Sequence, residues 1–503
     1  MRQSLALPGL AFLVGGCSII YNPDHITGAF DGAVDSPPDS QPIDANAAGL
    51  TLTQVDSPIL LEGQGTGASR KALLVIEGTN IVSGATVTIT GAPSVVPDQP
   101  AIVATTNSDL IAVPVTAMIH SGTTPSPTPI ALTVTVTQMS GGSPVTATIP
   151  WQLQELPELV AATGANAIDN TNPVQYSHVA LSGNATVSFS NSTSPVIIRA
   201  VGDLSIQSTG IASLSVSTAG VSPTGVFGGG NGGAIGNNGT GLPPGPGKVG
   251  DASDGGGGAG LAADGTSPGG TGNQGLAIGD ALISSYAANV GNGGGGGQKN
   301  GLSLGGSAGG GAGGTIELTA GGDLTAPAIS ANGGTGGNCS AGSAGGGGSG
   351  GVIVLRAAHI ATLNGVSVTA GNGGSSTVLG NASGGPGSAG RARVDGVMVN
   401  GSTSPAVHGA VFDPTTPQTV STPSVMVTLH GASSPNMFEL HDVGTGDNYQ
   451  DLPGTTMISV KFASSEFTTP VSLVKGMNRL CISPPGGPGN EESRNCVYVA
   501  YLP

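Results

Sequence analysis

The sequence predicts an all-β protein built from many short strands. Of its 503 residues, 90 are glycine and 36 are proline, about twice the average share of these two residues, and both disfavour helices. Valine, isoleucine and leucine remain common, and mean hydropathy is +0.17. They fall in short runs that alternate with polar residues and end at turn residues, which is the pattern of β-strands. Only 8% of residues are charged and 3% are aromatic, too few for long amphipathic helices or a conventional large enzyme core.

The charge of the chain argues against nucleic acid as a partner. The formal net charge is −16, from 29 acidic and 13 basic residues. The basic residues are scattered, and the close pairs are Arg70 with Lys71 and Arg391 with Arg393. A nucleic-acid backbone requires a concentrated positive surface, and so does an anionic membrane. We expect neither to be bound through charge.

The N-terminus resembles the signal of a bacterial lipoprotein. Arg2 precedes an apolar stretch over residues 5–14, and the sequence Val14-Gly-Gly-Cys17 has the aliphatic and small residues of a lipobox directly before a cysteine. The resemblance implies that residues 1–16 are a signal peptide and that Cys17 becomes the lipidated first residue. It also implies a protein anchored by lipid to the outer membrane or cell surface. The alternative is an ordinary cleaved signal in which Cys17 is incidental.

Residues 17–48 are predicted to be an acidic, proline-rich tether. Such a segment is kept extended and hydrated by its like charges and prolines, here Asp31, Asp35, Asp39, Asp44, Pro37, Pro38 and Pro42. Calcium binding by the aspartates is not favoured, because the glycine turn and terminal glutamate of a calcium loop are missing.

Residues 49–157 have the alternation of an antiparallel β-sandwich. Residues 74–91, LVIEGTNIVSGATVTITG, resemble the hairpin of IPT/TIG-type Ig-like domains, which implies an Ig-like sandwich. Trp151 is the only tryptophan. We expect it to fill the core rather than stack on a sugar, because it has no second aromatic residue nearby.

Residues 158–405 hold most of the glycine and contain an internal repeat. Residues 314–334 can be laid over 351–371, with a third copy at 196–210 and a truncated fourth at 388–394. Each full copy has three short apolar pieces within about twenty residues, the length of one coil of a solenoid. The region resembles glycine-rich, right-handed parallel β-helices of the pectin-lyase type, with excursions between coils, the longest from about residue 223 to 306. The alternative is a disordered or polyglycine-II-like region, because glycine loses the most entropy on ordering.

Residues 406–503 return to ordinary composition and end like a bacterial Ig-like domain. Five strand-like runs lie at 424–430, 437–441, 457–462, 476–482 and 495–501. The resemblance places Cys481 opposite Cys496 in a terminal hairpin, and export favours a disulfide between them. Closing a loop of about fifteen residues would contribute roughly 3 kcal/mol. Cys339 is then left over and is expected to be a free thiol.

No motif predicts a cofactor or a metal. A phosphate-binding loop, paired Cys/His spacing and the periodic aspartates of calcium-binding repeats are all missing from the sequence.

Polysaccharide lyases and hydrolases on parallel β-helices use clustered carboxylates, or calcium with a basic residue. The candidates for such chemistry here are Arg199, Asp203, Glu317, Asp323 and Arg356. The two arginines occupy nearly the same repeat position, and so do the two aspartates, which a repeated turn or surface preference explains more simply.

The C-terminal segment contains one grouping of histidine and aspartate. It consists of His430, His441 and Asp442. We expect surface histidines rather than a catalytic group.

We therefore expect a non-enzymatic, lipid-anchored surface protein that acts in adhesion, envelope structure or carbohydrate contact. Its anchor would be Cys17, and its ligand a polysaccharide or a surface protein. The alternative is a polysaccharide-active lyase or hydrolase, which rests on analogy with other β-helices and not on an identified site.

Overall fold

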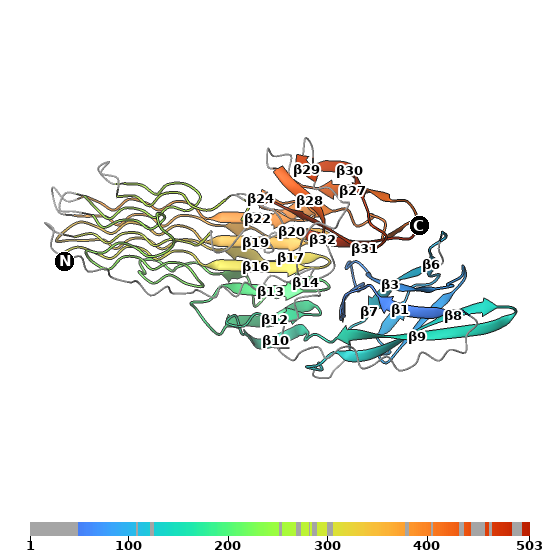
Figure 1. Cartoon of the computed structure of the whole chain (residues 1–503). Coiled ribbons are helices and arrows are strands. Elements are labelled where there is room, and N and C mark those ends of the chain that lie inside the picture. The colour runs from blue at the N-terminus through green and yellow to red at the C-terminus, as the bar shows by residue number, and fades with distance from the viewer. Residues whose placement is uncertain are drawn as a thin grey trace, which may run out of the picture.

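The computed structural model describes residues 49–503 apart from 107–108, 121–124, 251–253, 268–272, 281, 284–288, 299–304, 378–381, 404–405, 432–436, 444–457, 462–464 and 485–494. These described residues contain no helix, and their strands form both antiparallel and parallel sheets. The predictions of an all-β chain and of parallel sheets are therefore confirmed. Figure 1 shows an N-terminal module, a stack of parallel coils, a glycine-rich bundle that extends from the coils, and a C-terminal module.

The N-terminal module consists of two sheets that share one apolar core. One sheet has the order β1-β3-β7-β5 with β6 also on β7, and the other has the order β2-β9-β8-β4. Trp151 lies in the core between them, 6% exposed, and its Nε1 donates to the carbonyl of Pro58 at 3.0 Å. It fills the core as predicted. The strands are β1 (Thr51–Val55), β2 (Leu60–Leu61), β3 (Ala72–Thr79), β4 (Thr86–Thr90), β5 (Val95–Pro97), β6 (Ile102–Val103), β7 (Leu110–Ala117), β8 (Ile130–Ser140) and β9 (Ser143–Gln154).

The coil stack consists of three parallel sheets around a second apolar core. Their orders are β10-β12-β14-β17-β20-β23, β11-β13-β16-β19-β22-β24 and β15-β18-β21. The strands are β10 (Leu159–Ile168), β11 (Gln175–Tyr176), β12 (Val179–Phe189), β13 (Val196–Ala200), β14 (Leu204–Ile206), β15 (Ser213–Ser215), β16 (Thr315–Ala320), β17 (Leu324–Ala326), β18 (Ala328–Ser330), β19 (Val352–Ala357), β20 (Ile360–Leu363), β21 (Val366–Ser367), β22 (Arg391–Asp395), β23 (Met398–Gly401) and β24 (Val407–His408).

The register of the stack follows the repeat seen in the sequence. Ile316 pairs with Ile353 in one sheet, and Ile329 pairs with Val366 in another. These pairs have the same offset as the alignment of residues 314–334 with 351–371. Aliphatic side chains one coil apart therefore stack into ladders inside the coils, where Ile316 and Ile353 have no exposed surface.

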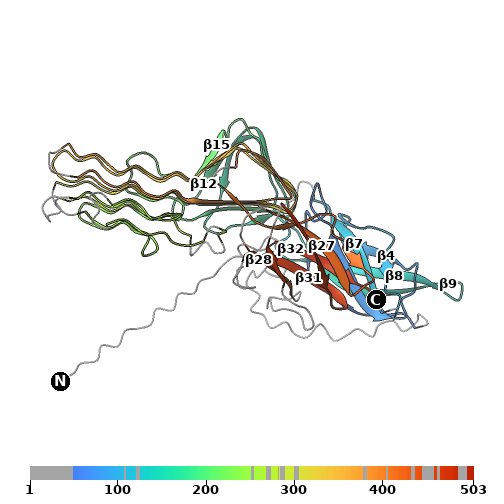
Figure 2. The same cartoon turned by 90° about the horizontal axis from the view of Figure 1, so that it is seen from above.

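The glycine bundle is formed by the excursions between coils (Figures 1 and 2). Its described segments lie outside the named strands, and their N–H groups change direction from one residue to the next. Gly294 donates to the carbonyl of Gly310, and Gly297, three residues on, donates to Ser307 of the same neighbouring segment. N–H groups that point in the same direction every third residue are characteristic of a polyproline-II helix. The polyglycine-II-like alternative thus describes the excursions, while the coils are β-structure.

Residues 293–297 show how tightly the bundle is bonded. Each of their N–H groups and each of their carbonyl oxygens has a backbone partner, spread over six surrounding stretches of chain. The N–H groups donate to Thr240, Gly310, Gly257, Asn237 and Ser307, and the carbonyls accept from Gly247, Gly233, Gly346, Gly250 and Gly236. Buried backbone groups must be paired, and here the neighbouring backbones supply every partner.

Only glycine permits backbones to approach this closely. A Cβ atom on Gly295 would lie 1.9 Å from the carbonyl oxygen of Lys248, and one on Gly294 would lie 2.2 Å from that of Gly346. Both distances are far below van der Waals contact, and both obstacles are backbone atoms that cannot rotate away. The glycine content is therefore a packing requirement of the bundle.

The C-terminal module also has two sheets, with the orders β25-β27-β30 and β26-β32-β31-β28-β29. The five strand-like runs expected from the sequence fall on β27, β28, β29, β31 and β32. The strands are β25 (Val411–Phe412), β26 (Thr419–Val420), β27 (Ser424–His430), β28 (Met437–Val443), β29 (Ile458–Lys461), β30 (Glu466–Ser472), β31 (Gly476–Ser483) and β32 (Asn495–Tyr501).

The two terminal modules pack directly on each other. Leu73 and Val75 of β3 join Met477 and Ala500 of the C-terminal module in one buried apolar cluster. Asp56 accepts a hydrogen bond from the N–H of Met477 at 2.9 Å. The modules and the coil stack therefore form a common base, from which the glycine bundle extends (Figure 1).

We predict that Gly295→Ala destabilises the bundle by about 3 kcal/mol, the upper part of the range for over-packing, because the new methyl group meets fixed backbone. Gly141→Ala is the control. A Cβ at Gly141 meets no atom within 4 Å, so its φ of +58° alone costs about 1 kcal/mol. Thermal unfolding with hydrogen exchange of bundle amides measures both. Equal losses in the two variants would contradict the packing explanation.

We predict that Asp56→Asn stabilises the interface between the terminal modules at neutral pH. Burial raises the pKa of Asp56 above its ordinary 3.8, the hydrogen bond from Met477 opposes that rise, and the charge of Glu77 adds to it. A raised folded-state pKa means that ionisation costs stability above that pKa, and that the cost disappears as pH falls below the unfolded value. Melting temperatures should show a gain for the variant at pH 7 that vanishes below about pH 4. A gain that does not depend on pH would exclude this cause.

Candidate functional site

The charged candidates of the coil stack lie on the outer face of one sheet. Alternate side chains of β13, β16 and β19 fill the coil interior, so Arg199, Glu317 and Arg356 face the other way. They are nevertheless buried, at 6%, 0% and 6% exposure. Leu261 and Ile283 of the long excursion pack on the same face.

Arg199 and Glu317 form a buried ion pair across two coils. The Arg199 Nε atom lies 2.9 Å from Oε1 of Glu317, and Nη2 lies 3.0 Å from Oε2. The hydroxyl of Thr319 also donates to Oε1, at 3.2 Å. Two parallel hydrogen bonds between a guanidinium and a carboxylate are among the stronger polar contacts in proteins. This pair joins β13 to β16.

Asp395, two coils further along on β22, is a second buried carboxylate with arginine partners. It lies 2.7 Å from Nη2 of Arg393 and 3.7 Å from Nε of Arg356. Its Oδ1 accepts from the N–H of Gly409 at 2.8 Å, and Arg393 donates to the carbonyl of Leu282 at 2.9 Å. These contacts connect the coil stack to the long excursion and to the start of the C-terminal module. Glu317 and Asp395, 0% and 1% exposed, offer no surface to a polysaccharide.

Asp203 and Asp323 stabilise turns at equivalent places in successive coils. Asp203 accepts from the N–H of Asp323 at 2.8 Å, and Asp323 accepts from the N–H of Ile360 at 3.0 Å. Each carboxylate thus bonds the backbone of the next coil, which is a repeated turn preference. Asp323 also lies 2.8 Å from Nδ1 of His359, a residue that the sequence had not singled out.

The histidines of the C-terminal module are placed separately. His430 on β27 lies 2.6 Å from Asp413. Burial opposes ionisation of Asp413, but hydrogen bonds from Thr415 and His430 outweigh it and hold its pKa below the ordinary value. The expectation of surface histidines is wrong for His441 on β28, which is 4% exposed. Asp442, its neighbour, is 2% exposed.

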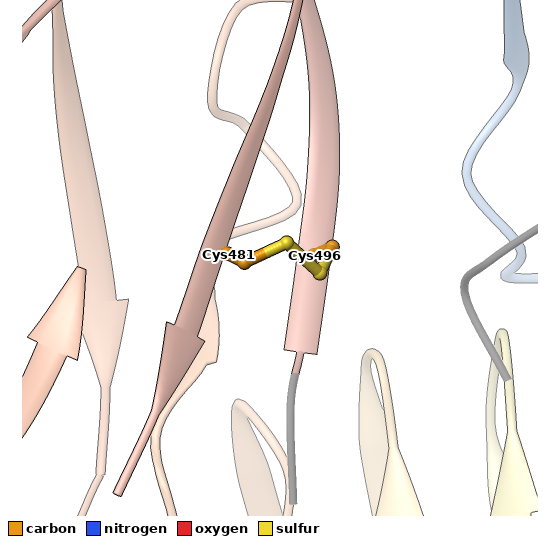
Figure 3. The surroundings of a disulfide bond; sticks show 2 residues. All are labelled: Cys481 and Cys496. Carbon is orange, nitrogen blue, oxygen red and sulfur yellow. A yellow bond between two sulfur atoms is a disulfide. The ribbon is translucent and has the colours of Figure 1, made fainter. Parts of the chain in front are cut away.

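The cysteines are partly as predicted. Cys481 and Cys496 pair across β31 and β32 and form a disulfide (Figure 3). Cys339 is buried, takes part in no disulfide, and its Sγ lies 2.8 Å from the carbonyl of Gly305. Cys17 and the tether lie outside the described residues.

A cavity of about 260 Å³ opens where the two terminal modules meet the coil stack. We call it the junction cavity. A loop of the N-terminal module, one coil turn and two segments of the C-terminal module line it: Ala68, Ser69, Arg70, Lys71, Ala358, His359, Phe412, Pro414, Gln418, Asn495, Cys496 and Val497. Sequence reasoning missed this cavity, although it had noted the Arg70–Lys71 pair. A second, smaller hollow adjoins it and shares Arg70, Lys71 and Gln418.

Several hydrogen bonds hold the walls of the junction cavity together. Arg70 donates from Nη2 to the carbonyl of Thr416 at 2.8 Å. Gln418 donates to the carbonyl of Lys71 at 2.8 Å, and Lys71 pairs with Asp98 at 2.6 Å on the open side. The cavity walls from distant parts of the sequence are therefore fixed to each other.

Within the part of the chain that the structure describes, no helix is long and apolar enough to cross a membrane. In the same residues, no three histidine, cysteine or acidic side chains are grouped so that they could hold a metal ion.

Comparison with known proteins gives no family. No family model matches the chain, and neither a curated protein nor a solved structure is similar to it at a significant level. The function is therefore argued from the geometry alone.

We predict that Arg199→Met destabilises the coil stack by about 3–5 kcal/mol, because it leaves Glu317 buried without its guanidinium. The double variant Arg199→Met/Glu317→Met should recover most of that loss, since apolar side chains often replace a buried pair without cost. Chemical unfolding of the three proteins, with hydrogen exchange of β13 and β16, gives the comparison. A double variant as unstable as the single one would contradict this description.

Proposed function

We propose that this protein is a lipid-anchored, non-enzymatic surface protein that holds a stiff glycine bundle away from the membrane for adhesion, envelope structure or carbohydrate contact. The observation that supports the proposal is the position of the bundle. It extends from one side of the base, whereas β1, the first strand of the chain, belongs to the N-terminal module on the other side (Figure 1). A lipid at Cys17 would therefore hold the base near the membrane and leave the bundle pointing outward.

The same proposal includes a fold type for each part of the molecule. The terminal modules would be Ig-like sandwiches, of the IPT/TIG type at the N-terminus, and the coil stack a right-handed β-helix of the pectin-lyase type. The two-sheet modules and the three parallel sheets are compatible with these assignments.

We favour ligand binding over catalysis because the candidate carboxylates are already bonded within the coil stack. Glu317 is bonded to Arg199, Asp395 lies beside Arg393, and Asp203 and Asp323 bond backbone. Glycoside hydrolysis requires two carboxylates that face the substrate, and these carboxylates serve the coils instead. A panel of acidic and neutral glycans should accordingly show no cleavage, and cleavage that depends on Asp323 would overturn this part.

The anchor is tested by labelling cells with a fatty-acid analogue. We expect the full chain to take up the label, Cys17→Ser to lose it because the acceptor thiol is gone, and Cys339→Ser to keep it. Protease treatment of intact cells should remove the wild-type protein from the surface. Label that persists in Cys17→Ser would refute the lipid anchor.

A further inference from the structure

The junction cavity combines features that the proposed function does not use. At about 260 Å³ it lies close to the lower end of the range for small-molecule sites, about 300–1,000 Å³, and suits one sugar unit rather than a polymer. Three parts of the molecule form its walls, so it exists only when both terminal modules are docked on the coil stack.

The charge of the cavity lining is unusual for this chain. The protein has a net charge of −16 and only 13 basic residues, and Arg70 with Lys71 is the only place where two of them are adjacent. Both line the cavity together with His359, and the described residues of the lining include no aspartate or glutamate. Such a lining favours an anion.

Asp98 and Asp323, which are not among the described lining residues, pair with Lys71 and His359. Asp98 holds the Lys71 ammonium on the open side, where Lys71 is 39% exposed. Asp323 is bonded at Nδ1 of His359, so Nε2 is the ring nitrogen that remains for a ligand. The guanidinium of Arg70, fixed at Nη2 by Thr416, suits the planar geometry of a carboxylate.

The remaining walls suit a sugar ring. Pro414 supplies exposed apolar surface for the C–H face of a pyranose, and Gln418 and Asn495 supply amide groups for its hydroxyls. An apolar wall beside a few converging polar groups is the usual composition of a small-molecule site.

We propose that the junction cavity binds a single uronic acid unit, free or at the end of an acidic glycan, with its carboxylate at Arg70 and its ring beside Pro414. This inference deepens the proposed carbohydrate contact and rests on it. The carboxylate is the chemistry that the cavity selects, and a neutral sugar of the same shape should bind poorly.

Calorimetric titration of the full mature chain with D-galacturonic acid tests the proposal, with D-galactose and inorganic phosphate as parallel titrants. We expect saturable binding of galacturonic acid that is about tenfold or more tighter than that of galactose, the size of one hydrogen bond to a charged group. Arg70→Gln should lose the same factor. Lys248→Gln, in the glycine bundle and outside the cavity lining, should bind as the wild type does.

A second variant guards against misfolding. Ala358→Leu fills the cavity and removes no polar contact, so it should weaken galacturonic acid binding while the melting temperature stays unchanged. Absence of saturable binding, equal affinity for galactose, equally tight binding of phosphate, or unchanged affinity in both Arg70→Gln and Ala358→Leu would each overturn the proposal. Fatty-acid labelling at Cys17 tests the lipid anchor separately from the cavity. Labelling can fail while the cavity binds galacturonic acid, and labelling can succeed while the cavity binds nothing.

Discussion

Direct contact between backbones is the interaction on which the rest of the molecule depends. In most folds, apolar side chains exclude water and the backbone is paired within helices or sheets. In the glycine bundle, the backbones exclude water from each other, and hydrogen bonds to several neighbours at once pair their polar groups. A Cβ at Gly294 or Gly295 would collide with the backbone of a neighbouring segment, so the glycine content follows from the architecture. The same arrangement explains why so few charged and aromatic residues suffice for a chain of 503 residues.

The side chains of the coil stack fix the register of neighbouring chain segments, which glycine residues cannot do because they have no side chain. Residues 305–314, 343–351 and 382–390 lead from the bundle directly into β16, β19 and β22. Aliphatic ladders align these strands. The buried pair of Arg199 with Glu317 joins β13 to β16, and Asp395 on β22 lies 3.7 Å from Arg356 on β19. Side chains in the coils thus determine the register, and the glycine segments continue it outward. The two terminal modules share a buried apolar cluster, which holds them together.

Sequence reasoning succeeded where side chains carry a pattern. The alignment of residues 314–334 with 351–371 predicted the observed register, β27 lies at residues 424–430 as predicted, and Cys481 pairs with Cys496. It could not choose between order and disorder for the excursions, because a run of glycine has no side chains to reveal its neighbours. The junction cavity was missed for another reason. Its walls come from residues about 70, 359, 418 and 496, and no local pattern signals that such distant segments meet.

The hydrogen-bond directions of the bundle repeat every three residues, and this period constrains how the length of the bundle can change during evolution. Gly294 and Gly297 bond the same neighbouring segment because one full turn separates them. Inserting three residues into each arm of a hairpin would lengthen the projection and return every later residue to its former orientation. Inserting one or two would turn the rest of the arm toward the wrong neighbours. Among related chains, length differences in these segments should therefore come in triplets, a rule that the coils, with their twofold alternation, do not share.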